Sequence, residues 1–215
     1  MRKEHSLIVT LVCLLLLGAI PAQSADVGTV FGTLWSARPI GAQAGEFGLN
    51  VGIADATSVY GTFTYGVGEH WDGRLKLGLI DDENMDPKLG FGIDLKNTFL
   101  DAGGPSNHPM DMAAGGFLEW YDTDPLTVMQ FGAVFLGSRD FMLKNNQIIT
   151  PYAQLSLRLE RVSWEFMGED NSDSDLEFGF NVGVKYQMTR YINLYGEFQL
   201  DGNDGLFVGL TYLIL

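Results

Sequence analysis

Cysteine, basic residues and long apolar runs are scarce in this chain of 215 residues, and each shortage excludes a class of protein. The only cysteine, Cys13, lies in a leader that we expect to be removed, so the mature chain can form no disulfide. Since no cysteine stands at the expected cleavage region, a lipid-anchored lipoprotein is also excluded. Beyond residue 25 no run of 18 apolar residues occurs, so the sequence predicts no transmembrane helix.

Basic residues are outnumbered two to one: 13 Lys and Arg stand against 27 Asp and Glu, which gives a formal net charge of −14. Removing Arg2, Lys3 and Glu4 with the leader leaves 11 basic and 26 acidic residues, a net charge of −15. A surface this acidic repels phosphate backbones, so we expect no nucleic-acid partner.

Histidine is nearly absent, which bears on catalysis. Beside His5 in the leader, only His70 and His108 occur, and both fall in expected turns. An outer-membrane hydrolase, the enzyme alternative, would need histidine or paired carboxylates beside a nucleophile or water. We therefore predict that the protein is not an enzyme and that it has no cofactor.

The amino-terminal residues have the three parts of a secretory leader. Arg2 and Lys3 form the positive region, residues 7–20 are almost unbroken apolar sequence, and Ala22-Gln23-Ser24-Ala25 supplies small residues for cleavage. This predicts a signal peptide over residues 1–24, cut after Ser24 or Ala25. Residues 25–215 then form one domain.

The rest of the chain is built from short segments with period-two alternation. Residues 176–188 show it most clearly, with large apolar residues at even positions opposed by polar or tiny residues at odd positions. The apolar set is Leu176, Phe178, Phe180, Val182, Val184, Tyr186 and Met188. This pattern is typical of a strand with one face to lipid and the other to a polar lumen.

The same pattern predicts ten strands, an even number as bacterial single-chain barrels require. They are residues 45–54, 58–66, 72–80, 88–96, 111–121, 126–136, 147–160, 176–188, 192–200 and 206–215. The fold class is therefore all-β: a single antiparallel up-and-down transmembrane β-barrel of about ten strands, with eight or twelve as alternatives. Residues 28–35 are a candidate additional strand. Residues 161–175 are expected to be a loop on the outer side, acidic over residues 169–175, and the long loops 97–110 and 137–147 fall on the side of the termini.

Several segments carry a family resemblance. The carboxy-terminal part of the chain resembles the end of small outer-membrane barrels of the OmpX and opacity-protein kind. The residues that carry the resemblance are Phe178-Gly179-Phe180-Asn181-Val182-Gly183-Val184-Lys185-Tyr186, a short turn, and Ile192-Asn193-Leu194-Tyr195-Gly196-Glu197. The earlier segment Tyr60-Gly61-Thr62-Phe63-Thr64-Tyr65-Gly66 resembles a hairpin strand of the same kind. The resemblance implies the same barrel fold and no common catalytic set. Barrels of this kind usually end in Phe, whereas this chain ends Tyr212-Leu213-Ile214-Leu215.

Charged residues within the strands are expected to face the lumen, because a Lys or Arg facing lipid at the midplane costs about 2–4 kcal/mol. They are Glu46, Arg74, Lys76, Lys88, Asp94, Lys96, Asp111, Glu119, Arg158, Glu177, Lys185 and Glu197. We expect them to pair with one another and fill a narrow interior. The alternative is a lumen that conducts solutes.

Acidic residues in the expected outer loops are weak metal candidates: Asp170, Asp173, Asp175, Asp201 and Asp204. Divalent cations want six to eight oxygen ligands, and no complete calcium-loop pattern is present. A solvated acidic rim is the preferred interpretation.

These observations predict a monomer in the bacterial outer membrane, exported through the periplasm, with membrane lipid and the barrel insertion machinery as its partners. The predicted role is structural or surface interaction. A small solute or ion channel, porin-like, is the first alternative. A secreted, soluble lipocalin-like binding barrel is the second.

Overall fold

The computed structural model describes residues 28–82, 86–102, 108–123, 126–144, 146–166 and 169–214. The predicted signal peptide lies outside the described residues. Within them, no helix is long and apolar enough to cross a membrane.

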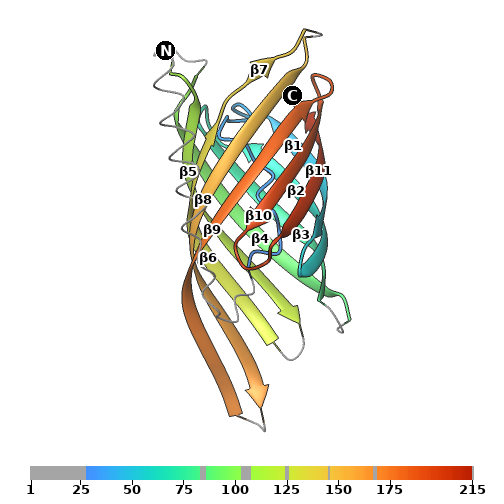
Figure 1. Ribbon diagram of the computed structural model, residues 1–215, viewed down its shortest axis with the longest axis vertical. Coiled ribbons are helices and arrows are strands. Elements are labelled where there is room, and N and C mark those ends of the chain that lie inside the picture. Colours follow the sequence, from blue (N-terminus) through green and yellow to red (C-terminus); the bar gives the residue numbers. More distant parts are fainter. Residues whose placement is uncertain are drawn as a thin grey trace, which may run out of the picture.

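Ten long strands form one closed antiparallel ring in the described part of the chain (Figure 1). They are β1 (Gly45–Ile53), β2 (Ala56–Gly66), β3 (Trp71–Asp82), β4 (Lys88–Leu100), β5 (Asp111–Thr123), β6 (Leu126–Ser138), β8 (Ile148–Phe166), β9 (Glu169–Gln187), β10 (Ile192–Leu200) and β11 (Gly205–Ile214). The two-residue strand β7 (Phe141–Met142) pairs with β8. Each long strand pairs with the next, and β1 closes the ring on β11, from Gly45 opposite Ile214 to Ile53 opposite Leu206. The predicted ten-stranded barrel is confirmed.

The two faces of the wall have opposite chemistry. Leu49 and Leu77 are 64% and 55% exposed on the outside, whereas Lys96 and Arg158 are fully buried inside. A soluble lipocalin-like barrel would bury its apolar side chains and expose its charges, so that alternative does not fit.

Aromatic side chains collect on the outside near the end of the wall where β1 begins and β11 ends, which we call the termini end. Tyr65 lies opposite Gly45, the first residue of β1, and Tyr212 lies opposite Phe47. Both are exposed, as are Trp71 at the start of β3 and Phe99 close to the end of β4. Amphipathic rings at this level are typical of a membrane interface.

At the other end, which we call the hairpin end, β8 and β9 project beyond the rest of the wall (Figure 1). Each has 19 residues, against nine in β10. At about 3.3 Å per residue they are roughly 60 Å long, against about 30 Å for β10. The ladder of β9 with β10 stops at Phe180, but its ladder with β8 continues to Glu169.

The sequence-based prediction of a loop over residues 161–175 is therefore wrong. Val162 lies opposite Asp173 and Ser163 opposite Ser172 in a regular antiparallel ladder. Asp173 and Ser172 are exposed. Beyond the hydrocarbon, water meets both faces of a hairpin, so backbone pairing continues although the apolar alternation stops.

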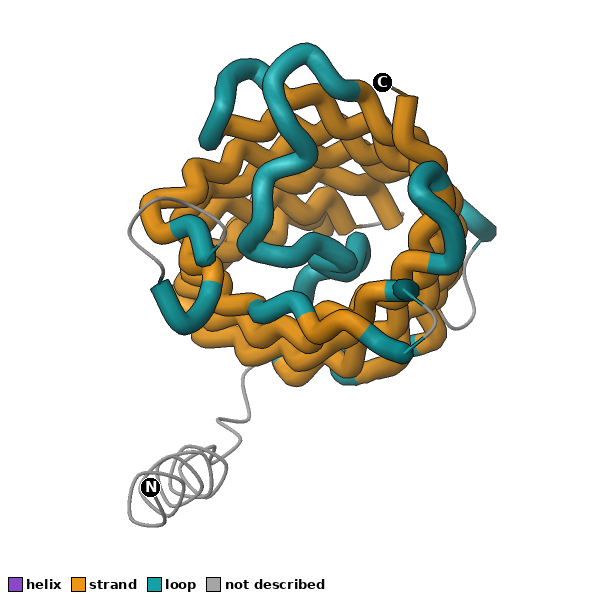
Figure 2. Tube along the Cα trace, turned by 90° about the horizontal axis from the view of Figure 1, so that it is seen from above, coloured by secondary structure: helices purple, strands orange, loops and turns teal. Residues whose placement is uncertain are grey.

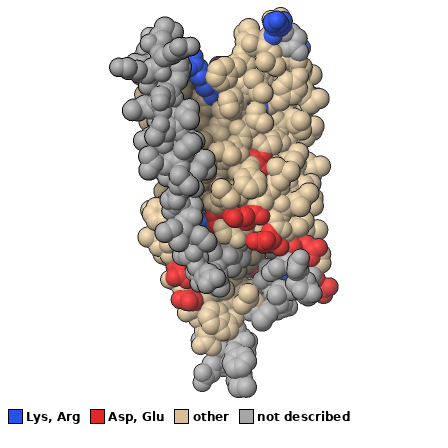
Figure 3. Space-filling view, viewed as in Figure 1, with Lys and Arg blue, Asp and Glu red and all other residues tan. Residues whose placement is uncertain are grey.

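The connections differ between the two ends. At the hairpin end they span residues 54–55, 83–87, 124–125, 167–168 and 201–204, all of them short. At the termini end the longer segments 101–110 and 139–147 join their strands. Both long segments lie on the side of the termini, as expected. The hairpin end projects because β8 and β9 are long, and not because its loops are long. In Figure 3 acidic atoms gather toward this end, and most of the wall above them is uncharged.

Residues 28–44 form no strand, and residues 28–37 run buried inside the ring, as the view down the barrel shows (Figure 2). Val30 and Phe31 are at most 1% exposed. The additional strand considered over residues 28–35 is therefore wrong. Alternation is lacking there because the lumen surrounds this segment on every side, so that Phe31, Leu34 and Trp35 are all buried.

Candidate functional site

The feature that distinguishes this barrel is residues 28–38, which we call the lumen segment. At the hairpin end, the Gly28 carbonyl accepts a hydrogen bond from Gln130 in β6. At the termini end, Ala37 lies against Thr98 near the end of β4. The chain then leaves through residues 39–44 and enters β1. The lumen segment therefore follows the barrel axis and runs opposite in direction to β1.

Side chains of the wall donate hydrogen bonds to the carbonyl oxygens of the lumen segment. Gln130 Nε2 donates to Gly28 O over 2.6 Å, and Ser58 Oγ donates to Val30 O over 2.7 Å. The series continues with Tyr60 to Gly32 O at 3.2 Å, Arg74 to Thr33 O at 2.5 Å, Lys96 to Ser36 O at 2.7 Å and Thr98 to Ala37 O at 2.6 Å. These bonds replace the ladder that a strand would use to satisfy its buried oxygens.

Carboxylates of the wall accept from the amides of the same segment. Glu197 Oε1 accepts from the Thr33 amide over 2.7 Å, and Glu197 Oε2 accepts from the Leu34 amide over 2.9 Å. The same carboxylate accepts from the Tyr152 hydroxyl over 2.8 Å. At the hairpin end Asp201 accepts from the Thr29 amide over 3.3 Å. Together these two carboxylates fix the backbone of the segment at Thr29, Thr33 and Leu34.

Two aromatic rings of the segment fill the space between the wall side chains. Trp35 lies between Arg74 and Lys96, whose cationic groups are each 4.3 Å from its ring centroid. Phe31 packs on Tyr60 with ring centroids 4.9 Å apart. A Cβ built on Gly90 of the wall would come within 2.8 Å of the Phe31 ring, so that glycine makes room for the segment.

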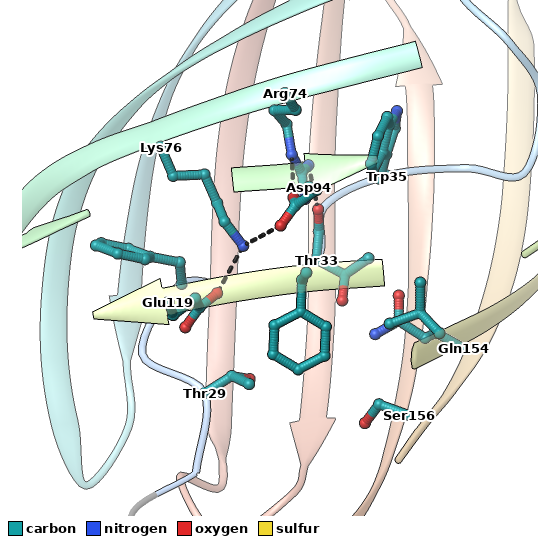
Figure 4. Close-up of a pocket in the computed structure, with 12 residues that line it drawn as sticks. Thr29, Thr33, Trp35, Arg74, Lys76, Asp94, Glu119, Gln154 and Ser156 are labelled. Carbon is teal, nitrogen blue, oxygen red and sulfur yellow. Dashed lines mark hydrogen bonds and ion pairs between the residues drawn. The ribbon is translucent and has the colours of Figure 1, made fainter. Parts of the chain in front are cut away.

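Beside the segment, the wall charges form a compact ion network (Figure 4). Arg74 Nε donates to Asp94 Oδ2 over 2.7 Å. Lys76 Nζ lies 3.0 Å from Asp94 Oδ1 and 2.6 Å from Glu119 Oε1. Such pairing offsets the desolvation of charges held inside a protein. The cavity left between this network and the segment is about 30 Å³. That is room for about two waters and far below the size of a solute site.

The structure places the twelve predicted lumen charges as follows. Nine are buried among the described residues: Glu46, Arg74, Lys76, Asp94, Lys96, Asp111, Glu119, Arg158 and Glu197. Lys88, Glu177 and Lys185 are half-buried. Four of the buried residues make up the network of Figure 4. Arg158 forms a separate group, 3.5 Å from Glu160 and 3.6 Å from Asp201.

The five metal candidates do not share one rim. Asp173 and Asp175 are exposed on β9, and the side chain of Asp170 lies outside the described part. Asp204 accepts from the amides of Asp201 and Gly202 and so closes the turn between β10 and β11. Asp201, expected on a solvated rim, is buried instead and holds the lumen segment. Within the described residues no three acidic, His or Cys side chains come together as a metal site.

Sequence reasoning missed two lumen charges and the segment itself. Asp72 is buried 3.2 Å from Lys96, and Glu160 accepts from Gln130 over 2.9 Å. Both could have been found, because Asp72 has the same parity as Arg74 and Glu160 has the same parity as Arg158. The lumen segment has no comparable sequence signal. Period-two alternation of apolar and polar residues identifies strands of the barrel wall, and it does not identify a chain enclosed by that wall.

Asp201 gives the hairpin end a pH dependence. Burial raises the pKa of the Asp201 carboxyl to about 6 from 3.8, against the opposing effect of Arg158. A carboxyl with a raised pKa favours the folded state while it is protonated. The contribution of Asp201 to the free energy of unfolding is complete below the carboxyl pKa of the unfolded chain. It is lost as pH rises through the folded-state pKa of about 6. The loss amounts to about 3 kcal/mol at most.

We therefore expect the wild-type chain to lose more stability than Asp201→Asn between about pH 4 and about pH 7. Urea unfolding in detergent micelles, followed at both pH values, measures the difference. Asp204→Asn is the matched control, because Asp204 is exposed in the same turn. Identical pH dependence in the wild type and Asp201→Asn would contradict this assignment.

An even ring of strands, apolar outside and charged inside, decides the class of fold. The chain is a transmembrane β-barrel. Solved structures that align with it include the N-terminal β-barrel domain of Pseudomonas aeruginosa OprF, at 12% identity over 81% of this chain and 99% of that one, with a TM-score of 0.38. The KdgM porin aligns at 6% identity over 78% of this chain and 98% of that one, with a TM-score of 0.41. No family model and no curated protein matches the sequence, so the resemblance to OmpX and opacity proteins stays a prediction.

Proposed function

We propose that this protein is a closed outer-membrane barrel with a structural or surface-interaction role, and that its own lumen segment keeps it from conducting solutes. One observation carries the proposal. The segment runs through the lumen from Gln130 near one end to Thr98 near the other, and the cavity between it and the ion network of Arg74, Lys76, Asp94 and Glu119 is about 30 Å³. A porin-like barrel of eight to ten strands already has little free interior.

The proposal includes export through the periplasm after removal of residues 1–24, insertion by the barrel assembly machinery and a monomeric state in lipid. The uncharged belt of the wall and the aromatic residues at the termini end support a bilayer location. The projecting ends of β8 and β9 supply the surface for contacts outside the membrane. At their tips, the exposed residues whose side chains the structure describes are Arg161 and residues 171–175, all of them polar or charged.

The test is electrical. The purified wild-type chain, inserted in planar bilayers, should give no stable single-channel steps, because the lumen segment leaves no passage. Folding is verified in the same sample by a shift in gel mobility on boiling, which closed barrels show. Regular ohmic steps from a correctly folded sample would reject the closed lumen and favour the small-channel alternative.

A further inference from the structure

We propose that the lumen is a binding site for a peptide recognised through its main chain, and that the lumen segment is a tethered ligand of this site. The inference rests on the proposed closed lumen and adds the chemical class of what closes it. The ligand is a peptide without regular secondary structure, uncharged over residues 28–37, with two repeats of Gly-Thr-aliphatic-aromatic.

The wall is complete without the segment. Every long strand pairs on both sides with other long strands, and β1 closes directly on β11. The wall cations also keep acidic partners on the wall itself: Arg74 and Lys76 pair with Asp94, and Lys96 pairs with Asp72. Withdrawing the segment therefore breaks no strand ladder and leaves these ion pairs in place.

The wall recognises the main chain of the bound segment. Wall side chains donate to the carbonyl oxygens of seven residues from Gly28 to Ala37. Carboxylates accept from the amides of Thr29, Thr33 and Leu34. Peptide recognition by strand addition uses the same groups of the ligand, but here polar side chains replace the edge of a sheet. A peptide whose backbone is free of helix and strand pairing is the class of molecule that presents both carbonyl and amide groups to such side chains.

A tandem repeat in the segment matches a repeated arrangement in the wall. Residues 28–31 read Gly-Thr-Val-Phe and residues 32–35 read Gly-Thr-Leu-Trp. Each threonine amide donates to a buried carboxylate, Thr29 to Asp201 and Thr33 to Glu197. Each threonine carbonyl accepts from the wall, Thr29 from Gln199 over 2.7 Å and Thr33 from Arg74 over 2.5 Å. The wall thus offers two successive subsites of the same kind.

Selectivity comes from the glycines that open each repeat. A Cβ on Gly32 would lie 2.7 Å from the ring of Phe207, a fully buried side chain of β11. Gly28 has φ +65°, and a Cβ there would meet the backbone nitrogen of Asn203 at 2.0 Å. The lumen therefore rejects side chains at both positions, while the aromatic positions are filled by Phe31 and Trp35.

The experiment separates wall from ligand. A barrel lacking residues 25–38 is folded into planar bilayers, and its folding is verified by the gel shift on boiling. We expect it to conduct. A synthetic peptide of residues 26–38 should then abolish the conductance saturably. The Gly32→Val version of that peptide should bind roughly tenfold to hundredfold more weakly, because the added side chain overpacks against Phe207.

A full-length variant keeps the inference testable if the shortened barrel does not fold. Gly32→Val in the intact chain should expel the segment and produce conductance that the wild-type peptide removes. Gly68→Val is the matched control, because a Cβ on Gly68 meets nothing within 4 Å, and it should stay closed.

Three results would overturn the inference: a folded shortened barrel that does not conduct, a conducting one that ignores the peptide, or failure of both altered chains to fold. If the shortened barrel does not fold, a folded Gly32→Val chain that stays closed would overturn it as well. A conducting wild type would instead reject the proposed closed lumen, so the two failures are distinguishable.

Discussion

Lys96→Met should lower the free energy of unfolding by about 3–5 kcal/mol, the usual cost of removing one partner of a buried ion pair. Lys96 is fully buried, with Nζ 3.2 Å from Asp72 Oδ2, and Asp72 is fully buried as well. Lys96 Nζ also donates to the carbonyl of Ser36 over 2.7 Å. The substitution leaves a carboxylate without its cation and a segment carbonyl without its donor. Urea unfolding in detergent micelles at neutral pH measures the loss.

The double variant Asp72→Asn with Lys96→Met is the control. It removes both charges while keeping similar volumes, so it should recover most of the lost stability. A double variant no more stable than the single one would show that the uncompensated charge is not the cause. The loss would then belong to the contact with the lumen segment.

Leu155→Lys should lower the stability in lipid vesicles by about 2–4 kcal/mol, the cost of a lipid-facing Lys at the bilayer midplane. Leu155 is 50% exposed on the outside of β8, opposite Phe135 on one neighbour and Phe180 on the other. Folding yield and urea unfolding in vesicles measure the effect. Ser172→Lys, on the projecting part of β9, is the control and should change little because Ser172 is exposed beyond β10. Equal losses of stability for the two variants would show that the membrane does not lie at the level of Leu155 as proposed.

The strands of the membrane region could be read from the sequence because lipid and lumen impose alternation on every residue. Residues 192–200 were predicted as a strand, and β10 spans those residues. The ends of β8 and β9 could not be predicted in this way. From Arg161 to Asp175 the apolar period stops where the hydrocarbon stops, while the hydrogen-bond ladder does not depend on side chains.

The lumen segment lay beyond prediction for a different reason. Its environment is enclosed on all sides, so Phe31, Leu34 and Trp35 are buried without any period. Its partners are scattered over the chain, as in the bond between Thr29 and Asp201, which are 172 residues apart. The alternation rule places Arg74 and Glu197 on the inner face of the wall, but it says nothing of which main chain they hold.

The short link between the lumen segment and β1 has a thermodynamic consequence. Only residues 39–44 separate the segment from the first strand, and the Gln43 amide and the Ala44 carbonyl are both hydrogen-bonded to Gly66. Once the ring has closed, the segment is confined next to its site at an effective concentration on the order of millimolar. Even a weak intrinsic affinity then keeps the lumen filled, and a free peptide below that concentration competes poorly with the resident one.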